Sequence, residues 1–331
     1  MDAVVAPLPI PVRVGIVGHG SIGTTVSEVL AGFDDVDVVG VAGRDGADAL
    51  LARDDVAVVA ICTPNGLHAE QALRGVRAGK HVVVEKPLSL SVGAGHEVVV
   101  AAAAAGVRVA VISQRRLEPA VRAAHAAIGG GTLGQPLLGE CLLRWHRDAA
   151  YYADVPWRGT LNLDGGALFN QAIHVLDLLR YLLGPVASVT GHTARLVHDI
   201  EAEDTAAATL EFASGALGVV SVTSGTAIGH PAELNLFFEQ GAIRFADDQV
   251  VEWVVPGVDR PNALSRVGSG SAAPSAIGQE GHRRQWRAII DALKSGEQPI
   301  VAGLDGLGTA ALVAAVHEAS RTGTTVRPEF R

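Results

Sequence analysis

Two side chains in this sequence, Lys86 and His174, are candidates for acid–base chemistry. Lys86 lies in the triplet Glu85-Lys86-Pro87, directly after the apolar run 82–84. A lysine ammonium there can donate to a substrate oxygen and favour its anionic form, although most lysines are simply solvated. His174 lies in an apolar segment, 167–183. An imidazole titrates near neutral pH, which suits a general base.

The segment around His174 carries two more polar residues at helical spacing. Asn170, His174 and Asp177 fall at i, i+4 and i+7, and so on one stripe of a helix that is otherwise apolar nearly all round. Buried polar groups cost several kcal/mol unless they have partners, so the stripe indicates a polar cavity or a satisfied core network. Asp177 could orient the imidazole. One histidine and one carboxylate fall short of a metal shell, so we expect no metal.

A glycine pattern near the start of the chain predicts a nucleotide site. Gly18, Gly20 and Gly23 have the spacing G-x-G-x-x-G, between an apolar strand at 12–17 and a helical pattern at 21–30. The first glycine allows a tight turn, the second lets the backbone approach a pyrophosphate, and the third lets helix and strand pack closely. The free N–H groups at the helix start would then face the phosphates.

The first third of the chain alternates strand and helix, which predicts a parallel sheet with helices on both faces. Polar residues that follow two of its strands, at 62–68 and 85–87, would face the crevice where such sheets bind ligands. The expected strands are 12–17, 36–41, 56–61, 82–84 and 107–112, and the expected helices are 21–30, 66–78 and 91–105.

After Pro136 the pattern changes to strands linked by short turns, which predicts a mostly antiparallel sheet. One long helix at 167–183 interrupts the strands, 256–278 reads as a loop, and helices at 279–294 and 304–321 close the chain. The expected strands are 137–145, 187–196, 205–212, 217–223, 234–238, 242–245 and 250–254.

Composition excludes several classes of protein. The formal charge is -9 and no run of Lys or Arg occurs, which argues against nucleic acid and anionic membranes as partners. The two cysteines, Cys62 and Cys141, indicate a reducing compartment. The start has no basic region and is not a signal peptide, and the longest apolar stretch, 98–105, is too short for a bilayer. We therefore expect a cytoplasmic protein.

The motifs in combination resemble one family. The glycine turn, Cys-Thr-Pro-Asn-x-x-His at 62–68, Glu-Lys-Pro at 85–87 and Gly-Gly-x-x-x-Asn-x-x-x-His-x-x-Asp at 165–177 occur in the order seen in the Gfo/Idh/MocA oxidoreductases. The resemblance implies an α/β protein with a Rossmann domain at 10–135 and a C-terminal α/β domain with a large open sheet at 136–303. The helix 304–321 could pack back on the first domain.

The resemblance also implies an activity, which is hydride transfer between a nicotinamide cofactor and a sugar, sugar derivative or cyclitol carbon. Lys86 would hold the reacting hydroxyl and His174 would exchange its proton. Asn170 stands where the family often has Asp, so it keeps only a hydrogen-bonding role. The residues implied in cofactor binding are Gly18, His19, Gly20, Ser21, Ile22, Gly23, Gly43, Arg44, Cys62, Thr63, Pro64, Asn65, His68, Glu85 and Lys86.

Substrate residues are expected just before the histidine motif, in the segment that lines the sugar pocket in relatives. Aromatic rings there would stack on a sugar face, and Arg158 could pair a carboxylate or phosphate. The predicted substrate-binding residues are Tyr152, Trp157 and Arg158, together with Asp177.

Two departures from the family pattern concern the cofactor. The second strand ends in Gly43-Arg44, which favours the 2′-phosphate of NADP, while the neighbouring Asp45 keeps NAD open. From Arg44 to Val56 there is room for only one short helix, at 46–52, where relatives usually fit a helix, a strand and a helix. We therefore expect a Rossmann sheet that lacks one edge strand and leaves the adenine side of the cofactor pocket more open.

The leading hypothesis is an NADP-preferring dehydrogenase of a sugar-like polyol. The alternatives are an NAD-dependent glycoside hydrolase of the same family and a non-catalytic NAD(P)-binding regulatory protein. A homodimer or homotetramer through the C-terminal sheet is expected. Strand residues that could serve either the core or that interface are Leu210, Phe212, Val220, Val222, Leu236 and Phe238.

Overall fold

A computed structural model describes residues 5–247, 249–261 and 279–329, and the chain divides into two compact units. Unit 1 comprises Met1–Gln114, Gln279–Ala310 and Phe330–Arg331, and unit 2 comprises Arg115–Gly278 and Ala311–Glu329. The division lies some twenty residues before the boundary expected at 135. Helix α8 (Glu280–Ser295) belongs to unit 1, and the long helix α9 (Gly303–Thr322) passes from unit 1 into unit 2.

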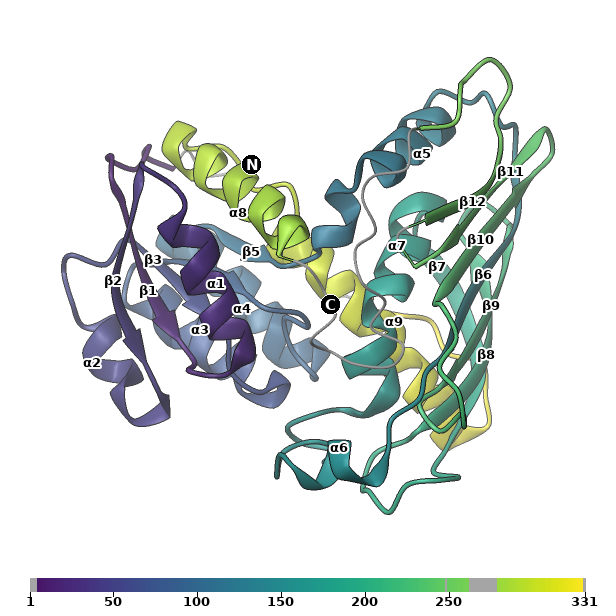
Figure 1. The fold of residues 1–331 in the computed structure, drawn as a ribbon, viewed down its shortest axis with the longest axis horizontal. Helices are drawn as coiled ribbons and strands as arrows, with labels where there is room; N and C mark the ends of the chain where they lie inside the picture. Colours follow the sequence, from purple (N-terminus) through teal and green to yellow (C-terminus); the bar gives the residue numbers. More distant parts are fainter. Residues whose placement is uncertain (1–4, 248, 262–278, 330–331) are drawn as a thin grey trace. The chain divides into compact units, whose positions relative to one another are not determined.

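Unit 1 contains the predicted parallel sheet, with strand order β2-β1-β3-β4-β5 (Figure 1). Its inner strands are almost fully buried, as their continuous β-branched runs predict. The strands are β1 (Val12–Val17), β2 (Val36–Ala42), β3 (Val58–Ile61), β4 (His81–Val84) and β5 (Val109–Val111).

Helices cover both faces of this sheet. Successive side chains of a strand point to opposite faces, and here both faces are apolar, so each face packs against helices. Ile16 packs in one apolar cluster with α1 (Ser21–Ala31) and α8, and Val17 packs in the other with α3 (His68–Arg77) and α4 (Val92–Ala105). The only other α-helix described between the strands is the short α2 (Ala47–Leu51). The doubly wound arrangement is therefore confirmed.

The expected loss of an edge strand is also confirmed. Residues 45–55 are all described and contain a 3-10 turn, α2 and turns, but no strand, so β2 is the edge of the sheet. Arg53 donates from Nη1 to the carbonyl oxygen of Val39 on β2, at 2.8 Å. The Arg53 and Arg13 guanidiniums both bind Asp55 and hold the pKa of its carboxyl below the ordinary value.

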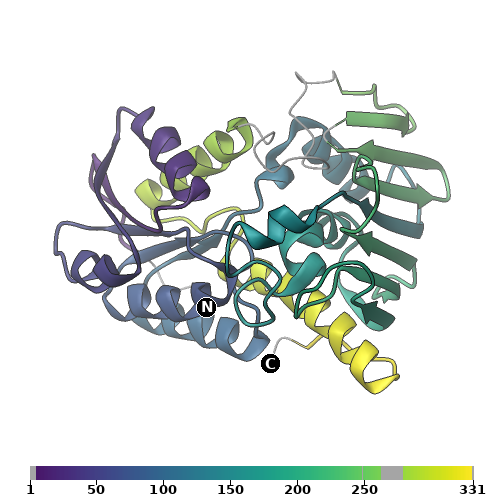
Figure 2. The ribbon, with the colours of Figure 1, turned by 60° about the horizontal axis from the view of Figure 1, so that its bottom comes forward.

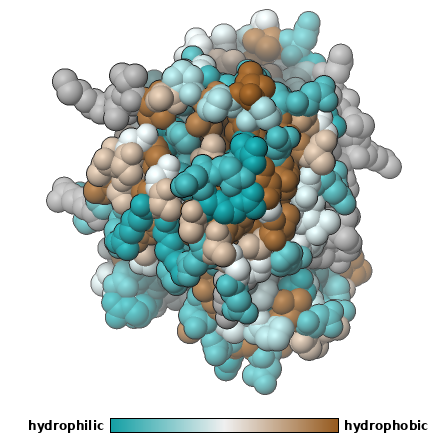
Figure 3. Space-filling model, turned by 90° about the vertical axis from the view of Figure 1, so that its left-hand side faces the viewer, coloured by the Kyte–Doolittle hydropathy of each residue, from teal (hydrophilic) through white to brown (hydrophobic). Residues whose placement is uncertain are grey.

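Seen from the side that carries β2 and α2, hydrophilic residues gather near the centre of the surface (Figure 3).

Unit 2 contains a seven-stranded sheet of order β12-β11-β10-β6-β9-β8-β7. Only the pair β6–β9 is parallel among these strands, so the predicted antiparallel character is confirmed. The strands are β6 (Pro136–Arg144), β7 (Val186–Ala194), β8 (Thr205–Phe212), β9 (Leu217–Thr223), β10 (Glu233–Phe238), β11 (Gly241–Ala246) and β12 (Gln249–Val254).

One face of this sheet is covered by helices, and no described helix lies on the other (Figures 1 and 2). Helix α7 (Ile173–Leu183) packs on β6 and β10, and α5 (Pro119–Gly129) packs on α7. The strand residues whose face the sequence could not assign all lie on the covered face, each no more than 5% exposed: Leu210, Phe212, Val220, Val222, Leu236 and Phe238.

The outer face carries an apolar row that crosses five strands. The strand registers place its members side by side: Leu217, Leu138, Phe237, Ala242 and Val254. Leu217 and Val254, at the two ends of the row, are 58% and 52% exposed. The outer face therefore carries one apolar row that is exposed at both ends, beside a polar row of Glu140, Asn235, Arg244 and Glu252.

Two expectations concern a loop and membrane-spanning helices. Most of the loop expected at 256–278 lies outside the described residues, since these stop at 261 and resume at 279. No helix in the described part of the chain has both the length and the apolar character that crossing a membrane requires.

Candidate functional site

The glycine turn at the end of β1 brings three backbone segments into close contact. Gly18 has φ +126°, and its N–H donates to the carbonyl oxygen of Ala42 at 2.8 Å. A Cβ on Gly18 would overlap the carbonyl group of Cys62, and a Cβ on Gly23 would overlap the carbonyl oxygen of Gly18. Both positions therefore require glycine for the packing of strand against helix.

Gly20 differs, because a Cβ there would meet nothing within 4 Å. It is the residue before α1, and no side-chain hydrogen bond caps this helix start. His19, Ser21 and Ile22 around it are exposed. The space over Gly20 and the N–H groups of the first turn of α1 can therefore hold an anionic group such as a pyrophosphate.

The predicted adenosine end of the site follows β2. A Cβ on Gly43 would lie 3.1 Å from Cδ2 of His19, so these two predicted cofactor residues are neighbours. Asp45 is exposed. The side chain of Arg44 lies outside the described part of the structure, so its proposed contact with a 2′-phosphate stays a prediction.

His68, expected at the cofactor, is a buried bridge between two loops. It is 1% exposed, with Nδ1 2.6 Å from the carbonyl oxygen of Pro87 and Nε2 2.7 Å from that of Thr63. Only an imidazolium can donate at both positions. Burial lowers the pKa of His68 below its ordinary value, and the two carbonyl acceptors oppose that effect. The ring ties the loop after β3 to the loop that carries Lys86.

Glu85 forms a second support next to Lys86. It is 6% exposed and accepts from Nε2 of His282, on α8, at 3.1 Å. Burial raises the pKa of this carboxyl, but the hydrogen bond and charge of His282, with the charges of Lys86 and His68, hold it below the ordinary value. Lys86 itself is partly buried. His282 carried no sequence signal, because its partner is 197 residues away.

The remaining predicted cofactor residues follow β3. Cys62 and Asn65 are buried, and burial raises the pKa of the Cys62 thiol well above its ordinary value. The Thr63 hydroxyl donates to Oε1 of Gln71 at 2.6 Å, and Pro64 is partly buried. This loop is therefore held from within unit 1 at the edge where β1, β3 and β4 end.

In unit 2 the helix that carries the predicted polar stripe begins with a π-helical turn, Leu168–Ala172, before α7. Asn170 lies in this turn, so the spacing of an ideal α-helix does not hold between it and Asp177. Asp177 is 4% exposed, and both its carboxylate oxygens accept from Arg116, at 2.7 and 2.6 Å. His174 is partly buried.

Glu203 explains the second of the two glycines before this helix. Its carboxylate accepts from the backbone N–H of Leu168 at 2.9 Å, and it lies 3.2 Å from Nε2 of His317 on α9. Gly166 has φ +89°, and a Cβ there would overlap the Glu203 carboxylate. The close approach of a buried carboxylate thus requires a glycine at this position.

Asp164 is the partner that sequence reasoning missed. It is 1% exposed, and its Oδ2 accepts from the N–H of Gly159 at 2.8 Å, while its Oδ1 accepts from Nδ2 of Asn170. A carboxylate is therefore present beside Asn170, six residues earlier in the chain. The Asn170 amide is therefore held through Nδ2 by a buried carboxylate.

Tyr151 joins Asn170 to the predicted substrate residues. Its hydroxyl lies 3.5 Å from Nδ2 of Asn170, and the Arg158 guanidinium lies 4.1 Å from the centre of its ring. Arg147 lies 5.1 Å from the same ring centre. Tyr152 packs edge-on against Tyr151 with ring centres 5.0 Å apart. One cluster in unit 2 therefore holds Asn170, two tyrosines and two arginines.

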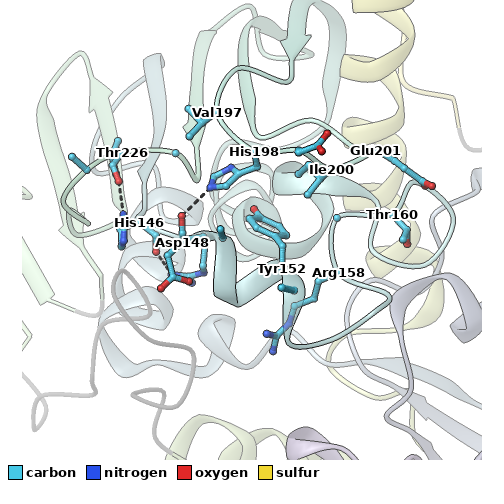
Figure 4. Close-up of a pocket in the computed structure, with 17 residues that line it drawn as sticks. His146, Asp148, Tyr152, Arg158, Thr160, Val197, His198, Ile200, Glu201 and Thr226 are labelled. Atoms are coloured by element: carbon cyan, nitrogen blue, oxygen red, sulfur yellow. Dashed lines mark hydrogen bonds between the residues drawn. The ribbon is translucent and has the colours of Figure 1, made fainter.

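Next to this cluster lies a pocket of about 700 Å³ within unit 2 (Figure 4). Of the residues predicted to bind substrate, Tyr152 and Arg158 line this pocket, whereas Trp157 and Asp177 do not. Among the residues that the structure describes, no three His, Cys, Asp or Glu side chains gather as a metal shell would.

The fold and the glycine turn define a dinucleotide-binding α/β protein, and two family models match the chain. The model of the oxidoreductase family with an NAD-binding Rossmann fold matches residues 44–113, and the model of the GFO/IDH/MocA C-terminal domain matches 121–244.

Known proteins agree with these matches over nearly the whole chain. Myo-inositol 2-dehydrogenase of Thermotoga maritima is 28% identical over 318 residues, which cover 89% of this chain and 92% of the relative. D-apiose dehydrogenase of Rhizobium rhizogenes is 29% identical, with 88% and 85% covered. The solved structure of the WlbA dehydrogenase from Bordetella pertussis, in complex with NADH and UDP-GlcNAcA, is 30% identical with a TM-score of 0.86, covering 97% of this chain and 99% of that one.

The chain belongs to the Gfo/Idh/MocA family of NAD-binding oxidoreductases.

Matched substitutions can separate the role of Gly20 in phosphate binding from the role of Gly18 in packing. Gly20→Ala should leave the free energy of unfolding unchanged, because its Cβ meets no protein atom, yet lower NADH affinity about tenfold or more by filling the phosphate space. Gly18→Ala should lower both, with a stability loss of about 2 kcal/mol or more from the overlap and the positive φ. Urea unfolding and NADH fluorescence titration measure the two effects. Equal NADH affinity of Gly20→Ala and the unaltered chain would contradict this assignment.

The Asp164–Asn170 pair can be tested without a substrate. Asp164→Asn removes a buried charged acceptor and should lower the free energy of unfolding by about 1–3 kcal/mol. The reciprocal exchange, Asp164→Asn with Asn170→Asp, restores one donor facing one carboxylate and should recover at least half of that loss. If the double variant is no more stable than the single one, the two side chains are not coupled.

Proposed function

We propose that this protein transfers a hydride between a nicotinamide cofactor and a hydroxyl-bearing carbon of a sugar, sugar derivative or cyclitol. The observation that carries the proposal is the placement of Lys86 on a braced loop at the sheet edge that also holds the glycine turn, in a chain of this oxidoreductase family. Relatives named for inositol and apiose support the class of substrate.

Two side chains are assigned to the hydroxyl group that reacts. The ammonium of Lys86 donates to the reacting oxygen and stabilises the negative charge that develops there, and the imidazole of His174 accepts the hydroxyl proton. The nicotinamide, when bound, supplies the hydride acceptor. Asn170, held by Asp164, keeps a hydrogen-bonding role beside the reacting group.

For the cofactor we propose a preference for NADP over NAD. Gly43 leaves no side chain to compete for the ribose, and Arg44 follows with a guanidinium suited to a 2′-phosphate. The WlbA dehydrogenase structure contains NADH, and Asp45 offers a carboxylate for the ribose hydroxyls of NAD, so both cofactors belong in the assay.

We also propose that the protein forms homodimers or homotetramers in the cytoplasm through the outer face of the seven-stranded sheet. The apolar row on that face, from Leu217 to Val254, is what supports this.

Turnover is tested by the absorbance of reduced nicotinamide with inositols, apiose, other sugars and UDP-sugars, each with NADP and NAD. Lys86→Ala and His174→Ala should each lower kcat by about 10²–10⁴-fold, because a group that handles the proton is lost. Lys80→Ala, at the opposite end of β4 and hydrogen-bonded to the carbonyl oxygen of Arg53, is the matched control and should retain activity.

The outcomes distinguish the rival functions. Unchanged activity of both site variants would refute the assigned chemistry. Release of a sugar without net cofactor reduction would indicate the glycoside hydrolase, and cofactor binding without turnover of any compound would indicate the regulatory protein.

Assembly through the sheet is tested by Leu217→Lys. The new ammonium would lie beside the Glu211 carboxylate of β8, so the pairing of β8 with β9 should be retained. It would also place a charge in the apolar row. Sedimentation should show a shift to monomers, whereas Val100→Lys, at another exposed apolar position on α4, should leave assembly unchanged. A wild-type chain that sediments as a monomer would refute the proposal.

A further inference from the structure

The pocket beside Tyr152 has no part in the proton and hydride chemistry above. Its lining residues come from four segments of unit 2, at 146–153, 158–160, 197–201 and 225–227, and neither Asn170 nor His174 is among them. In Figure 4 the Tyr152 ring stands at its centre, with His198 and Ile200 beside it.

One wall of this pocket is held in place by a buried carboxylate. Asp204 is 0% exposed and accepts from the backbone N–H groups of Leu196, Val197 and His198, at 2.9, 2.8 and 2.8 Å. Burial raises the pKa of this carboxyl, but the backbone donors outweigh that effect and hold it below the ordinary value. The loop 196–198 therefore has a fixed conformation, and the pocket is preformed.

The aromatic centre of the pocket is equally fixed. The Tyr152 hydroxyl lies 2.9 Å from Oγ of the fully buried Ser224, and its ring centre lies 4.7 Å from that of His198. Nε2 of His198 lies 2.9 Å from the carbonyl oxygen of Arg147 and so donates to it. A rigid aromatic side chain among polar groups is the usual surface for a sugar ring.

The pocket adjoins the tyrosine pair that contacts Asn170 in unit 2. Tyr152 packs on Tyr151, and the Tyr151 hydroxyl lies 3.5 Å from Nδ2 of Asn170. A cavity of about 700 Å³ is in the range that holds a ligand of drug size. A single ring placed at Asn170 and His174 would leave this pocket free for a second part of the substrate.

Charge argues for an uncharged second part. The lining includes the carboxylates Asp148, Asp199 and Glu201, against the guanidiniums of Arg147 and Arg158. Both guanidiniums also pack on the Tyr151 ring. Among the lining residues the carboxylates outnumber the guanidiniums by three to two, which disfavours a diphosphate, whereas hydroxyl groups can donate to carboxylates and accept from arginines.

We propose that this pocket binds a second, uncharged sugar residue, linked to the sugar that is oxidised, so that the substrate is a glycoside rather than a free monosaccharide or cyclitol. The proposal rests on the proposed function for its link to the reacting ring, but sugar binding in the pocket can be measured without turnover.

The test uses two neighbouring exposed positions. Ala227 lines the pocket, and Ile228, 72% exposed, is not among its lining residues. Ala227→Trp should fill the pocket, and Ile228→Trp is the matched control of equal bulk. Saturation-transfer NMR and calorimetry would compare cellobiose, maltose and trehalose with glucose, myo-inositol and UDP-glucose, in the absence of cofactor.

We expect at least one neutral disaccharide to bind about tenfold or more tightly than glucose, with Ala227→Trp abolishing that difference and Ile228→Trp preserving it. No preference for any disaccharide, or a preference that survives Ala227→Trp, would overturn the proposal. Tighter binding of UDP-glucose that Ala227→Trp removes would overturn the uncharged class. Disaccharide binding in the pocket without hydride transfer would support sugar binding there, but it would refute the proposed function and with it the assignment of a glycoside as the oxidised substrate.

Discussion

The close approach of backbone to backbone at the carboxyl edge of the five-stranded sheet is the constraint on which the nucleotide site depends. Gly18 lies against the Cys62 carbonyl, and Gly23 lies against the Gly18 carbonyl, so no side chain fits at either place. The turn after β1 and the loop after β3 are thus fixed to each other. His68 then fixes the loop after β3 to the loop after β4 through two carbonyl contacts. The position of Lys86 follows from this chain of short contacts.

Unit 2 uses a different device for the same purpose. Three buried carboxylates each hold a stretch of backbone, namely Asp164 at Gly159, Glu203 at Leu168 and Asp204 at 196–198. A carboxylate that accepts backbone N–H groups is compensated for its burial, and it fixes a loop that has no regular hydrogen-bonding pattern of its own. Gly159 and the loop 197–198 line the pocket beside Tyr152, and Leu168 begins the turn that holds Asn170.

Much of the fold could be predicted from the sequence, because it depends on local patterns. Alternating and continuous apolar runs predicted the strands of both sheets, and the short span from Arg44 to Val56 predicted the missing edge strand. Local pattern could not assign faces in the second sheet, because residues such as Leu210 and Val220 are buried or exposed according to distant helices. It also could not predict the π-turn at Leu168–Ala172, which interrupts the helical spacing between Asn170 and Asp177.

The candidate site was predictable where it consists of a motif and not where it consists of distant partners. The glycine turn was recognisable from its spacing between a strand and a helix, and the Glu-Lys-Pro loop from its place directly after a strand. The partners of these residues lie far away in the chain, as His282 does from Glu85 and Arg116 from Asp177. The tertiary structure brings such pairs together, and no periodic pattern in a single sequence indicates which distant residues will be partners.

The loss of one strand from the first sheet has a consequence for how the chain meets other chains. An uncovered edge strand is a template for intermolecular pairing, and natural proteins commonly guard such edges with charge. Here the Arg53 guanidinium occupies an edge carbonyl of β2 that a neighbouring strand would otherwise use, and Arg13 and Asp55 add charge beside it. The shortened sheet therefore carries its own protection against edge-to-edge aggregation.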